Sequence, residues 1–230
     1  ASAPALGGRY RLEYQGAGAL LLGGVSNQTT GVGYIEFDFT PTDSNSIDIR
    51  ITATASGNHI RGLKCYLVAH AALAASGQVV HPAFDAAYGG IGLLRFMLAQ
   101  DTNKNAQSIW ADAPQPTSIG RGVSWLEMVK VCNELGCHGW FHFPYAATAD
   151  YVTQAATVVR DNLNPALKAY FEYGNECWNS SYNFDCYPYL DALRAGKSYN
   201  VYEQWGGRST ECMVAASAVF AGQMGRIVRV

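Results

Sequence analysis

A change in hydrophobic periodicity near residue 58 most constrains the fold of this 230-residue chain. Before it, apolar and polar residues alternate with period two, in runs bounded by clusters of Gly, Asn, Ser and Pro. This pattern is typical of antiparallel strands with one solvated face. Residues 1–58 therefore predict a small antiparallel β module. The alternating apolar positions are Tyr10, Leu12, Tyr14, Ile35, Phe37, Phe39, Ile47, Ile49 and Ile51.

After residue 58, short apolar segments alternate with helical patterns. Ser124 and Glu127 have the spacing of a capping box, which predicts the start of one helix, and Gly136 predicts its end. Strands that alternate with helices form βα units and a parallel sheet. Residues 59–230 therefore predict an α/β domain with five strands, at 62–68, 92–99, 138–143, 168–173 and 226–230. The main helices are predicted at 124–135, 149–163 and 211–224.

Composition narrows the class of protein. Hydrophobic residues make up 49% of the chain, which excludes disorder as its main state. The net charge of −2 provides no basic field for nucleic acid or an anionic membrane, and no run reaches the roughly 20 apolar residues of a membrane span. Many aromatic residues (12%) with few charged ones (15%) suit an extracellular or sugar-facing protein.

The cysteines bear on the compartment. An even count of six in a weakly charged chain favours disulfides in an oxidising compartment, hence secretion; buried free thiols are the alternative. No pair has the spacing of a zinc site. Cys177 and Cys186 are near the candidate site below, where a disulfide would stiffen a loop, but the sequence does not fix the pairing. Sequons at Asn27 and Asn179 permit glycosylation if the source is eukaryotic.

The segment with the strongest candidates for catalytic and binding residues is 169–179, AYFEYGNECWN. A predicted strand runs directly into Asn175 and Glu176, and the carboxyl ends of parallel βα strands are where the active sites of barrels lie. A carboxylic acid beside an apolar ring such as Trp178 can act as a general acid. The alternative is a helix N-terminus, capped by Asn175 and with Glu176 complementing the helix dipole.

The complete segment resembles the acid/base segment of the (β/α)8 clan of retaining glycoside hydrolases. The chain is also similar, over about residues 60–230, to a group of secreted cellulose-binding-type or hydrolase-like proteins. The resemblance implies an α/β fold in which the β module precedes the first half, about five strands, of a TIM-type barrel. It implies no metal and no organic cofactor. The similar pieces are Leu94–Met97, Thr102–Asn103, Ser108–Asp112, Trp140–Pro144 and Glu172–Asn179.

The resemblance also implies roles by position. Glu176 matches the general acid/base, and Asn175 matches the amide that binds the substrate 2-hydroxyl. Arg95 matches an arginine that supports the nucleophile, although an arginine within a strand also commonly pairs with a buried acid for structure. His142 lies where a His or Asn often faces substrate, although a histidine taken alone is more often a core or rim residue.

Three aromatic residues are further candidates. Trp110 and Trp178 are candidate sugar-stacking rings, because an aromatic face suits the apolar face of a pyranose, and core anchoring is their alternative. Tyr145 either lines the cleft or covers the top of the barrel. Tyr145 and His142 also depart from the family pattern, which has His and Asn there, and so do Leu98 (for Asp) and Ala113 (for Arg). These departures weaken the transfer of a particular activity and raise the chance of a non-catalytic relative.

A retaining glycosidase needs two carboxylates, roughly 5 to 5.5 Å apart. In the clan the nucleophilic Glu lies on the seventh strand, whereas Val230 falls in the fifth predicted strand, so the nucleophile is expected outside this chain. Glu172, four residues before Glu176, is expected deeper in the barrel and is not a substitute. We therefore expect an extracellular carbohydrate-active protein that acts on a polysaccharide or oligosaccharide.

Two alternatives of another class remain at this stage. One is a non-catalytic glycan-binding or structural surface glycoprotein that keeps a degenerate barrel. The other is a partner-assembled or filament subunit in which the exposed surface of the half-barrel is an interface. An isolated half-barrel exposes strand edges and apolar interior, which self-assembly or the remaining half of the barrel would cover.

Overall fold

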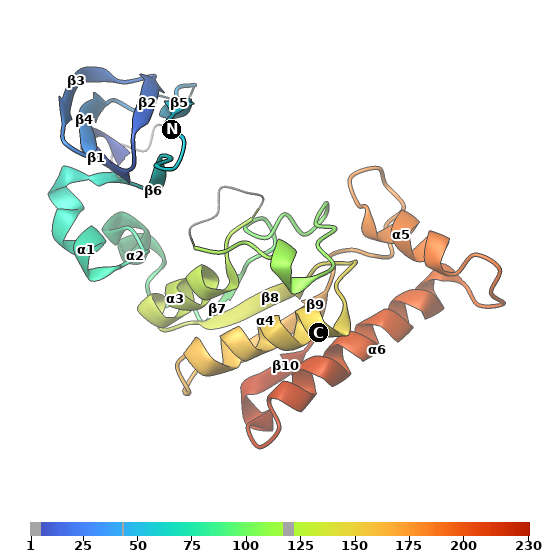
Figure 1. Cartoon of the computed structure of the whole chain (residues 1–230). Coiled ribbons are helices and arrows are strands. Elements are labelled where there is room, and N and C mark those ends of the chain that lie inside the picture. Colours follow the sequence, from blue (N-terminus) through green and yellow to red (C-terminus); the bar gives the residue numbers. More distant parts are fainter. Residues whose placement is uncertain (1–5, 43, 117–121) are drawn as a thin grey trace. The chain divides into compact units, whose positions relative to one another are not determined.

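The structure is a computed structural model that describes residues 6–42, 44–116 and 122–230. The chain divides into two compact units, Ala1–Gln78 and Val79–Val230 (Figure 1). Each unit has its own sheets and its own cluster of buried apolar side chains. The chain is mixed α/β, with antiparallel sheets in the first unit and a four-stranded parallel sheet in the second.

Antiparallel strands build the first unit, as the period-two alternation predicts. One sheet has the order β3-β4-β1-β6, and β2 pairs with β5 in another. Leu12 lies opposite Ile35 on the inner face, and both are buried with Phe37. On the outer face Arg11 donates to Glu36 at 2.8 Å. The elements are β1 (Gly8–Gln15), β2 (Gly18–Gly23), β3 (Ser26–Gly31), β4 (Tyr34–Phe39), β5 (Asp48–Thr54), β6 (Arg61–Leu67) and α1 (Ala71–Ser76).

One predicted barrel strand belongs to this first unit. The segment predicted at 62–68 is β6, which pairs antiparallel with β1, with Leu12 opposite Cys65. The sequence contains a reason for this antiparallel pairing. Polar Lys64 alternates with the apolar neighbours Leu63 and Cys65, as in a strand with one solvated face. The first unit therefore extends to Gln78 rather than 58, and the parallel sheet has four described strands rather than five.

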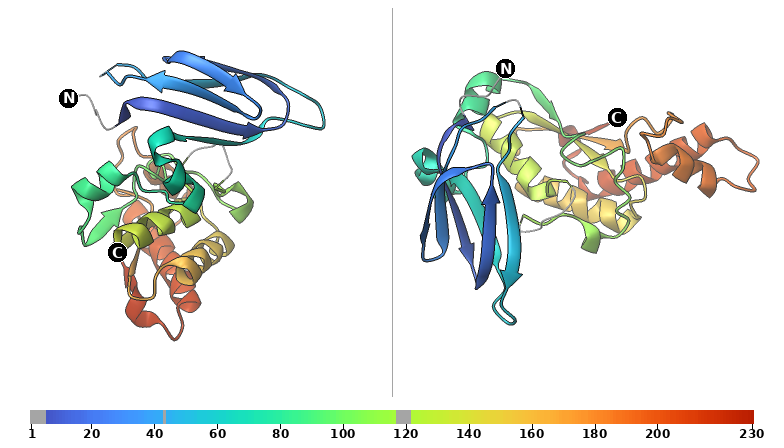
Figure 2. Two further views of the ribbon diagram at one scale, coloured as in Figure 1. Left: turned by 90° about the vertical axis from the view of Figure 1, so that its left-hand side faces the viewer. Right: turned by 90° about the horizontal axis from the view of Figure 1, so that it is seen from above.

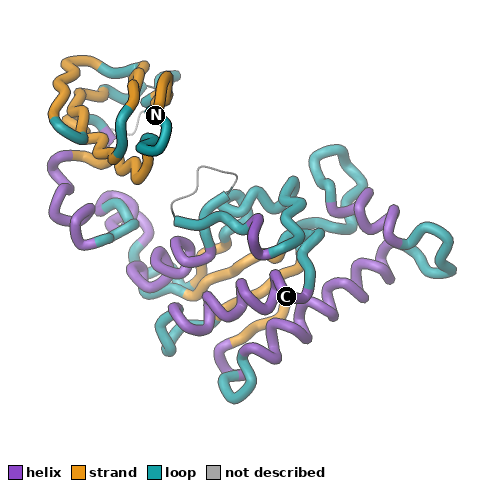
Figure 3. Tube along the Cα trace, viewed as in Figure 1, coloured by secondary structure: helices purple, strands orange, loops and turns teal. Residues whose placement is uncertain are grey.

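The second unit alternates strands and helices along the chain (Figure 3). Its four parallel strands stand in chain order, β10-β9-β8-β7. Ser124 and Glu127 form the predicted capping box, and Gly136 ends that helix in a left-handed conformation. The elements are α2 (Pro82–Tyr88), β7 (Leu93–Arg95), α3 (Trp125–Leu135), β8 (His138–Phe143), α4 (Ala149–Asn162), β9 (Ala169–Tyr173), α5 (Cys186–Leu193), α6 (Val201–Val219) and β10 (Ile227–Arg229).

Helices α3, α4 and α6 lie side by side along one face of the parallel sheet (Figures 1 and 2). Stacked rings fill the space between them and the strands. Trp125 of α3 lies 5.7 Å from Phe143, which lies 5.0 Å from Phe171, and the Phe171 ring meets Phe220 at 6.0 Å. Since successive strand residues point to opposite faces, the neighbours of these rings point to the face without those helices.

Within the described residues, no helix has the length and apolarity to cross a membrane. The same residues hold no group of three or more His, Cys, Asp or Glu side chains suited to a metal ion. They contain one disulfide, between Cys177 and Cys186, whose pairing the sequence left open. Cys65, Cys132, Cys137 and Cys212 are free thiols.

Candidate active site

The candidate site is at the carboxyl ends of β7, β8 and β9. The parallel register sets Arg95 beside Trp140, and His142 beside Glu172. Trp140, His142 and Glu172 alternate with buried core residues along their strands, so they lie on the face that α3, α4 and α6 do not cover. Arg95 joins them through its hydrogen bond to Glu172. Strand pairing thus brings together residues that are up to 77 positions apart in the sequence.

A carboxylate stands at the centre of this group. One oxygen of Glu172, Oε2, accepts a hydrogen bond from Arg95 Nη2 at 2.8 Å and another from Trp140 Nε1 at 2.8 Å. His142 Nδ1 lies 3.4 Å from the same oxygen. The Arg95 guanidinium lies over the Trp140 ring, 4.6 Å from its centroid. Charge-assisted hydrogen bonds and a cation–π contact together fix the plane of the guanidinium.

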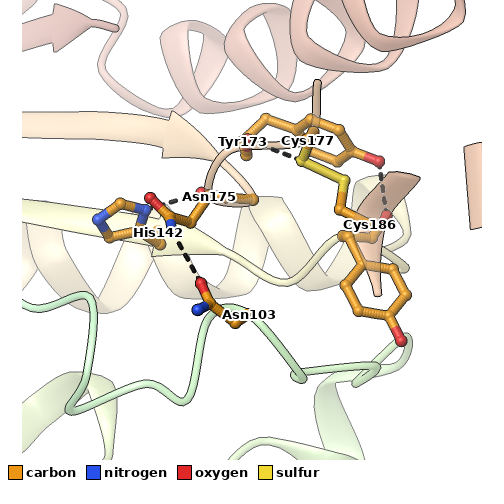
Figure 4. The surroundings of a disulfide bond; sticks show 8 residues. Asn103, His142, Tyr173, Asn175, Cys177 and Cys186 are labelled. Carbon is orange, nitrogen blue, oxygen red and sulfur yellow. Dashed lines mark hydrogen bonds between the residues drawn. A yellow bond between two sulfur atoms is a disulfide. The ribbon is translucent and has the colours of Figure 1, made fainter. Parts of the chain in front are cut away.

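Asn175 is only 2% exposed, and its amide is held at both ends. The Oδ1 atom accepts from Arg95 Nη2 at 2.9 Å. The Nδ2 atom donates to Asn103 Oδ1 at 2.7 Å (Figure 4). An amide can make up to four hydrogen bonds, so one N–H and one lone pair remain available. Because Arg95 is a donor and the Asn103 oxygen is an acceptor, they fix the orientation of the Asn175 amide, with Oδ1 toward Arg95 and Nδ2 toward Asn103.

His142 is buried, at 1% exposure, and holds the turn that follows β9. Its Nδ1 lies 2.8 Å from the Gly174 carbonyl oxygen, so Nδ1 is the protonated nitrogen that donates (Figure 4). Its Nε2 is buried without a hydrogen-bond partner in the described part of the chain. Burial lowers the pKa of this imidazole, while the Gly174 carbonyl and the Glu172 carboxylate raise it less. His142 is therefore a neutral side chain that holds the turn in place through its hydrogen bond to Gly174.

The turn after β9 has an unusual backbone. Gly174 and Glu176 both have positive φ, 63° and 45°. A Cβ on Gly174 would lie 2.3 Å from Cys177 Sγ, so only glycine fits there. A non-glycine residue with positive φ is uncommon and costs about 1–3 kcal/mol, and such residues cluster at functional sites. No helix begins at Asn175 or Glu176 in the described residues, because α5 starts at Cys186, so the helix-capping alternative does not apply.

The carboxyl ends of the strands open into a cavity of about 320 Å³. It brings together four of the seven residues singled out from the sequence: Arg95, Asn175, Glu176 and Trp178. The Glu176 carboxylate lines the cavity and accepts a hydrogen bond from Asn179 Nδ2 at 3.0 Å. The Trp178 ring is 51% exposed, which leaves it open to a ligand. The other lining residues are Glu172, Tyr173, Trp205, Ser209 and Val230.

The other three candidates are not among the lining residues. His142 is buried and hydrogen-bonded to the Gly174 carbonyl. Trp110, in a short helical turn at Trp110–Asp112, packs edge-on against Tyr151 at 5.4 Å. Tyr145 is buried against Tyr189, with ring centroids 5.1 Å apart. Trp110 therefore packs against the core, which was its alternative from the sequence, and Tyr145 is itself a member of the buried cluster.

Several residues of the site were not predicted from the sequence. Glu172 was expected deeper in the barrel, yet it lines the same cavity as Glu176. Its signal is its position in AYFEY, where it is the charged residue out of phase with buried Ala169, Phe171 and Tyr173. Trp205 and Ser209 come from α6, which begins ten residues before its predicted start at 211. Asn103 belongs to a matched piece of sequence but had no assigned role.

The cavity combines an acid, an amide, a guanidinium, a second carboxylate and an exposed indole. Such a set can bind a polyhydroxylated ligand through hydrogen bonds and ring stacking, and it can exchange a proton with that ligand through Glu176. Comparisons of the chain with protein-family models, with curated proteins and with solved structures find no match, so the geometry of this cavity carries the functional argument.

Proposed function

We propose that this chain is part of an extracellular, carbohydrate-active protein of the retaining glycoside hydrolase type. Glu176 is its general acid/base, and the nucleophilic carboxylate lies outside this chain. The observation that carries the proposal is the cavity at the carboxyl end of β9, where Glu176 stands beside Asn175, Arg95 and the exposed Trp178 ring. The ligand is a polysaccharide or oligosaccharide, and the chemistry needs no cofactor.

The arrangement of the second unit supports a (β/α)8 barrel. Its parallel strands stand in chain order, and α3, α4 and α6 cover one face, so each βα unit advances the sheet in one direction. Doubly wound sheets instead reverse their strand order and carry helices on both faces. In a barrel the uncovered face, with Arg95, Trp140 and Glu172, is the interior, and its carboxyl end is the active-site face.

Two features favour further βα units beside this sheet. Strands β7 and β10 each pair on one side only within the described residues, and unpaired edges attract partners. Next to β10, a groove of about 510 Å³ runs between α6 and Arg229 and is lined in part by Met213 and Val214. A fifth βα unit packed against β10 would cover this groove. The second carboxylate of the retaining mechanism would then come from later strands of the barrel.

The proposed chemistry assigns two successive roles to Glu176. As an acid it gives its proton to the glycosidic oxygen of the leaving sugar while the nucleophile attacks the anomeric carbon. As a base it then removes a proton from the water that hydrolyses the glycosyl-enzyme intermediate. Asn175 presents its remaining N–H to the sugar, and Trp178 stacks on the apolar face of a pyranose.

The test is Glu176→Gln in the complete protein, assayed against panels of β-glucans and β-mannans. The amide keeps the shape of the side chain but cannot donate a catalytic proton, so hydrolysis should fall by about a hundredfold or more. Asp161→Asn, an exposed carboxylate on α4 paired with Arg160, is the matched control and should cleave like the wild type. Equal cleavage by Glu176→Gln and the wild type would refute the proposal.

A second function has one specific observation in its favour. Arg95 and Asn103 hold the Asn175 amide in place, and Arg95 and Trp140 hold one oxygen of Glu172. These side chains are fixed before a ligand arrives, as in a site built to hold a ligand rather than to transform it. The chain would then be a non-catalytic glycan-binding or structural surface glycoprotein. Sugar binding without cleavage by either the wild type or Glu176→Gln would select this function.

A further inference from the structure

We infer that Glu172 and Arg95 form a paired donor–acceptor clamp for two neighbouring hydroxyl groups of a neutral sugar. The inference rests on the proposal that this cavity binds carbohydrate, and it names the class of sugar and the residues that select it. Glu172 is then a specificity-determining residue of the site, although its position four residues before Glu176 suggested only a place deeper in the barrel.

The carboxylate of Glu172 uses only half of its capacity within the protein. Both hydrogen bonds that it accepts, from Arg95 Nη2 and Trp140 Nε1, go to Oε2. Its other oxygen, Oε1, accepts none from the described residues. The side chain lines the cavity and is 19% exposed. Glu172 therefore offers the cavity an acceptor on a carboxylate whose orientation two donors already fix.

The Arg95 guanidinium beside it has unused hydrogen-bond donors. Nη2 of Arg95 donates to both Glu172 and Asn175, whereas among the described residues Nη1 has only a weak contact with Met97 Sδ at 3.7 Å. Stacking on Trp140 holds the plane of the group, and Arg95 lines the same cavity. A fixed donor therefore lies beside a fixed acceptor, and little side-chain entropy remains to be lost when a ligand binds.

This pairing matches a vicinal diol. Each sugar hydroxyl both donates and accepts, so one hydroxyl can donate to Glu172 Oε1 while its neighbour accepts from Arg95 Nη1. The formal charge of the ionisable lining residues is −1, from Glu172, Glu176 and Arg95. A uronate would bring its own carboxylate toward that of Glu172, and like charges at short range are costly. The clamp therefore selects neutral pyranoses over uronic acids.

Calorimetric titration of the chain tests the clamp. The probes are cellohexaose and mannohexaose as neutral ligands and hexagalacturonate as the anionic one. We expect the wild type to bind a neutral probe at least tenfold more tightly than the uronate. Glu172→Gln removes the charge and keeps the shape, so it should weaken neutral binding at least tenfold and narrow the gap to the uronate. Arg95→Lys, which loses the planar fork, should also weaken neutral binding.

The controls separate the clamp from the proposed hydrolase activity. Asp161→Asn should bind like the wild type, and Glu176→Gln should retain neutral binding. Cleavage is assayed separately in the complete protein, where Glu176→Gln should lose it. The clamp is overturned if the wild type binds no neutral probe, or binds the uronate equally well, or if a folded Glu172→Gln binds like the wild type. If Glu172→Gln weakens binding but no form of the complete protein cleaves the sugar, the clamp stands and the hydrolase proposal fails.

Discussion

His142 illustrates how burial and one hydrogen bond define the state of a side chain. The Gly174 carbonyl accepts a hydrogen bond from the protonated Nδ1, and Nε2 has no described partner to stabilise a second proton. Burial disfavours the charged imidazolium, which is why its pKa lies below the ordinary value of 6.5. The unfolded chain therefore binds a proton at His142 more readily than the folded chain does as the pH falls.

The sign of the pH effect follows from this difference. His142 contributes stability that is fully present above about pH 6.5 and is lost as the pH falls through its folded pKa. Each pKa unit by which folding lowers the pKa of His142 corresponds to about 1.4 kcal/mol of stability.

In His142→Asn the amide nitrogen can replace Nδ1 as donor to Gly174, and the group no longer titrates. We expect urea unfolding, followed by circular dichroism, to show a smaller loss of stability from pH 7 to pH 5 in this variant. Parallel stability curves for the two proteins would contradict this assignment.

At the scale of single residues, local sequence predicted part of the site and could not predict the rest. Asn175, Glu176 and Trp178 are consecutive or nearly so, and their position after a strand was sufficient to group them. The partnership of Arg95 with Glu172 depends on strand register, which links positions 77 residues apart. Short-range patterns carry no information on such a pairing, so the clamp was visible only in the structure.

Among the elements, the turn between β9 and α5 depends on the disulfide. The Cys177–Cys186 bond has a sequence separation of 9 and joins the residue after Glu176 to the first residue of α5. Without it, the strained Glu176 backbone has one covalent restraint fewer. The disulfide therefore restrains the backbone of the site and also stabilises the second unit.

Replacing both cysteines, in Cys177→Ser/Cys186→Ser, should lower the free energy of unfolding of the second unit. The loop-entropy relation gives about 2.7 kcal/mol for a loop of roughly ten residues at 25 °C. Thermal unfolding by differential scanning calorimetry measures the loss. Cys65→Ser, at an exposed free thiol of the first unit, is the control and should leave that transition unchanged. An unchanged midpoint in the double variant would show that the bond does not support this unit.

Element boundaries were predictable where the sequence contains a local stop or start signal. The capping box at Ser124 and Gly136 fixed α3 correctly. For α6, the start at Asn200 and Glu203 is also a capping box, but Gly206 and Gly207 interrupt the apolar pattern and concealed the first turns. For β6, one alternating segment is compatible with either sheet, and tertiary pairing with β1 decided between them.

At the scale of the whole molecule, two separate cores predict two separable unfolding transitions. The first unit is centred on Leu12, Leu22, Ile35 and Phe37, and the second has its own larger cluster. Phe37→Ala removes a fully buried ring, which costs roughly 3–5 kcal/mol. Hydrogen exchange followed by mass spectrometry should show faster exchange in residues 8–67 and little change in the strands of the parallel sheet. Faster exchange in β8 and β9 would show that the units unfold together.

The ring stack of the second unit has an optical consequence. All five tryptophans of the chain, Trp110, Trp125, Trp140, Trp178 and Trp205, lie within Val79–Val230, whereas the aromatic residues of the first unit are tyrosines and phenylalanines. Trp125 is buried against Phe141 and Phe143, while Trp178 faces the cavity. Indole emission therefore reports on one unit alone. Within it, the blue-shifted component belongs to the core, and the component that an external quencher reaches belongs to the mouth of the cavity.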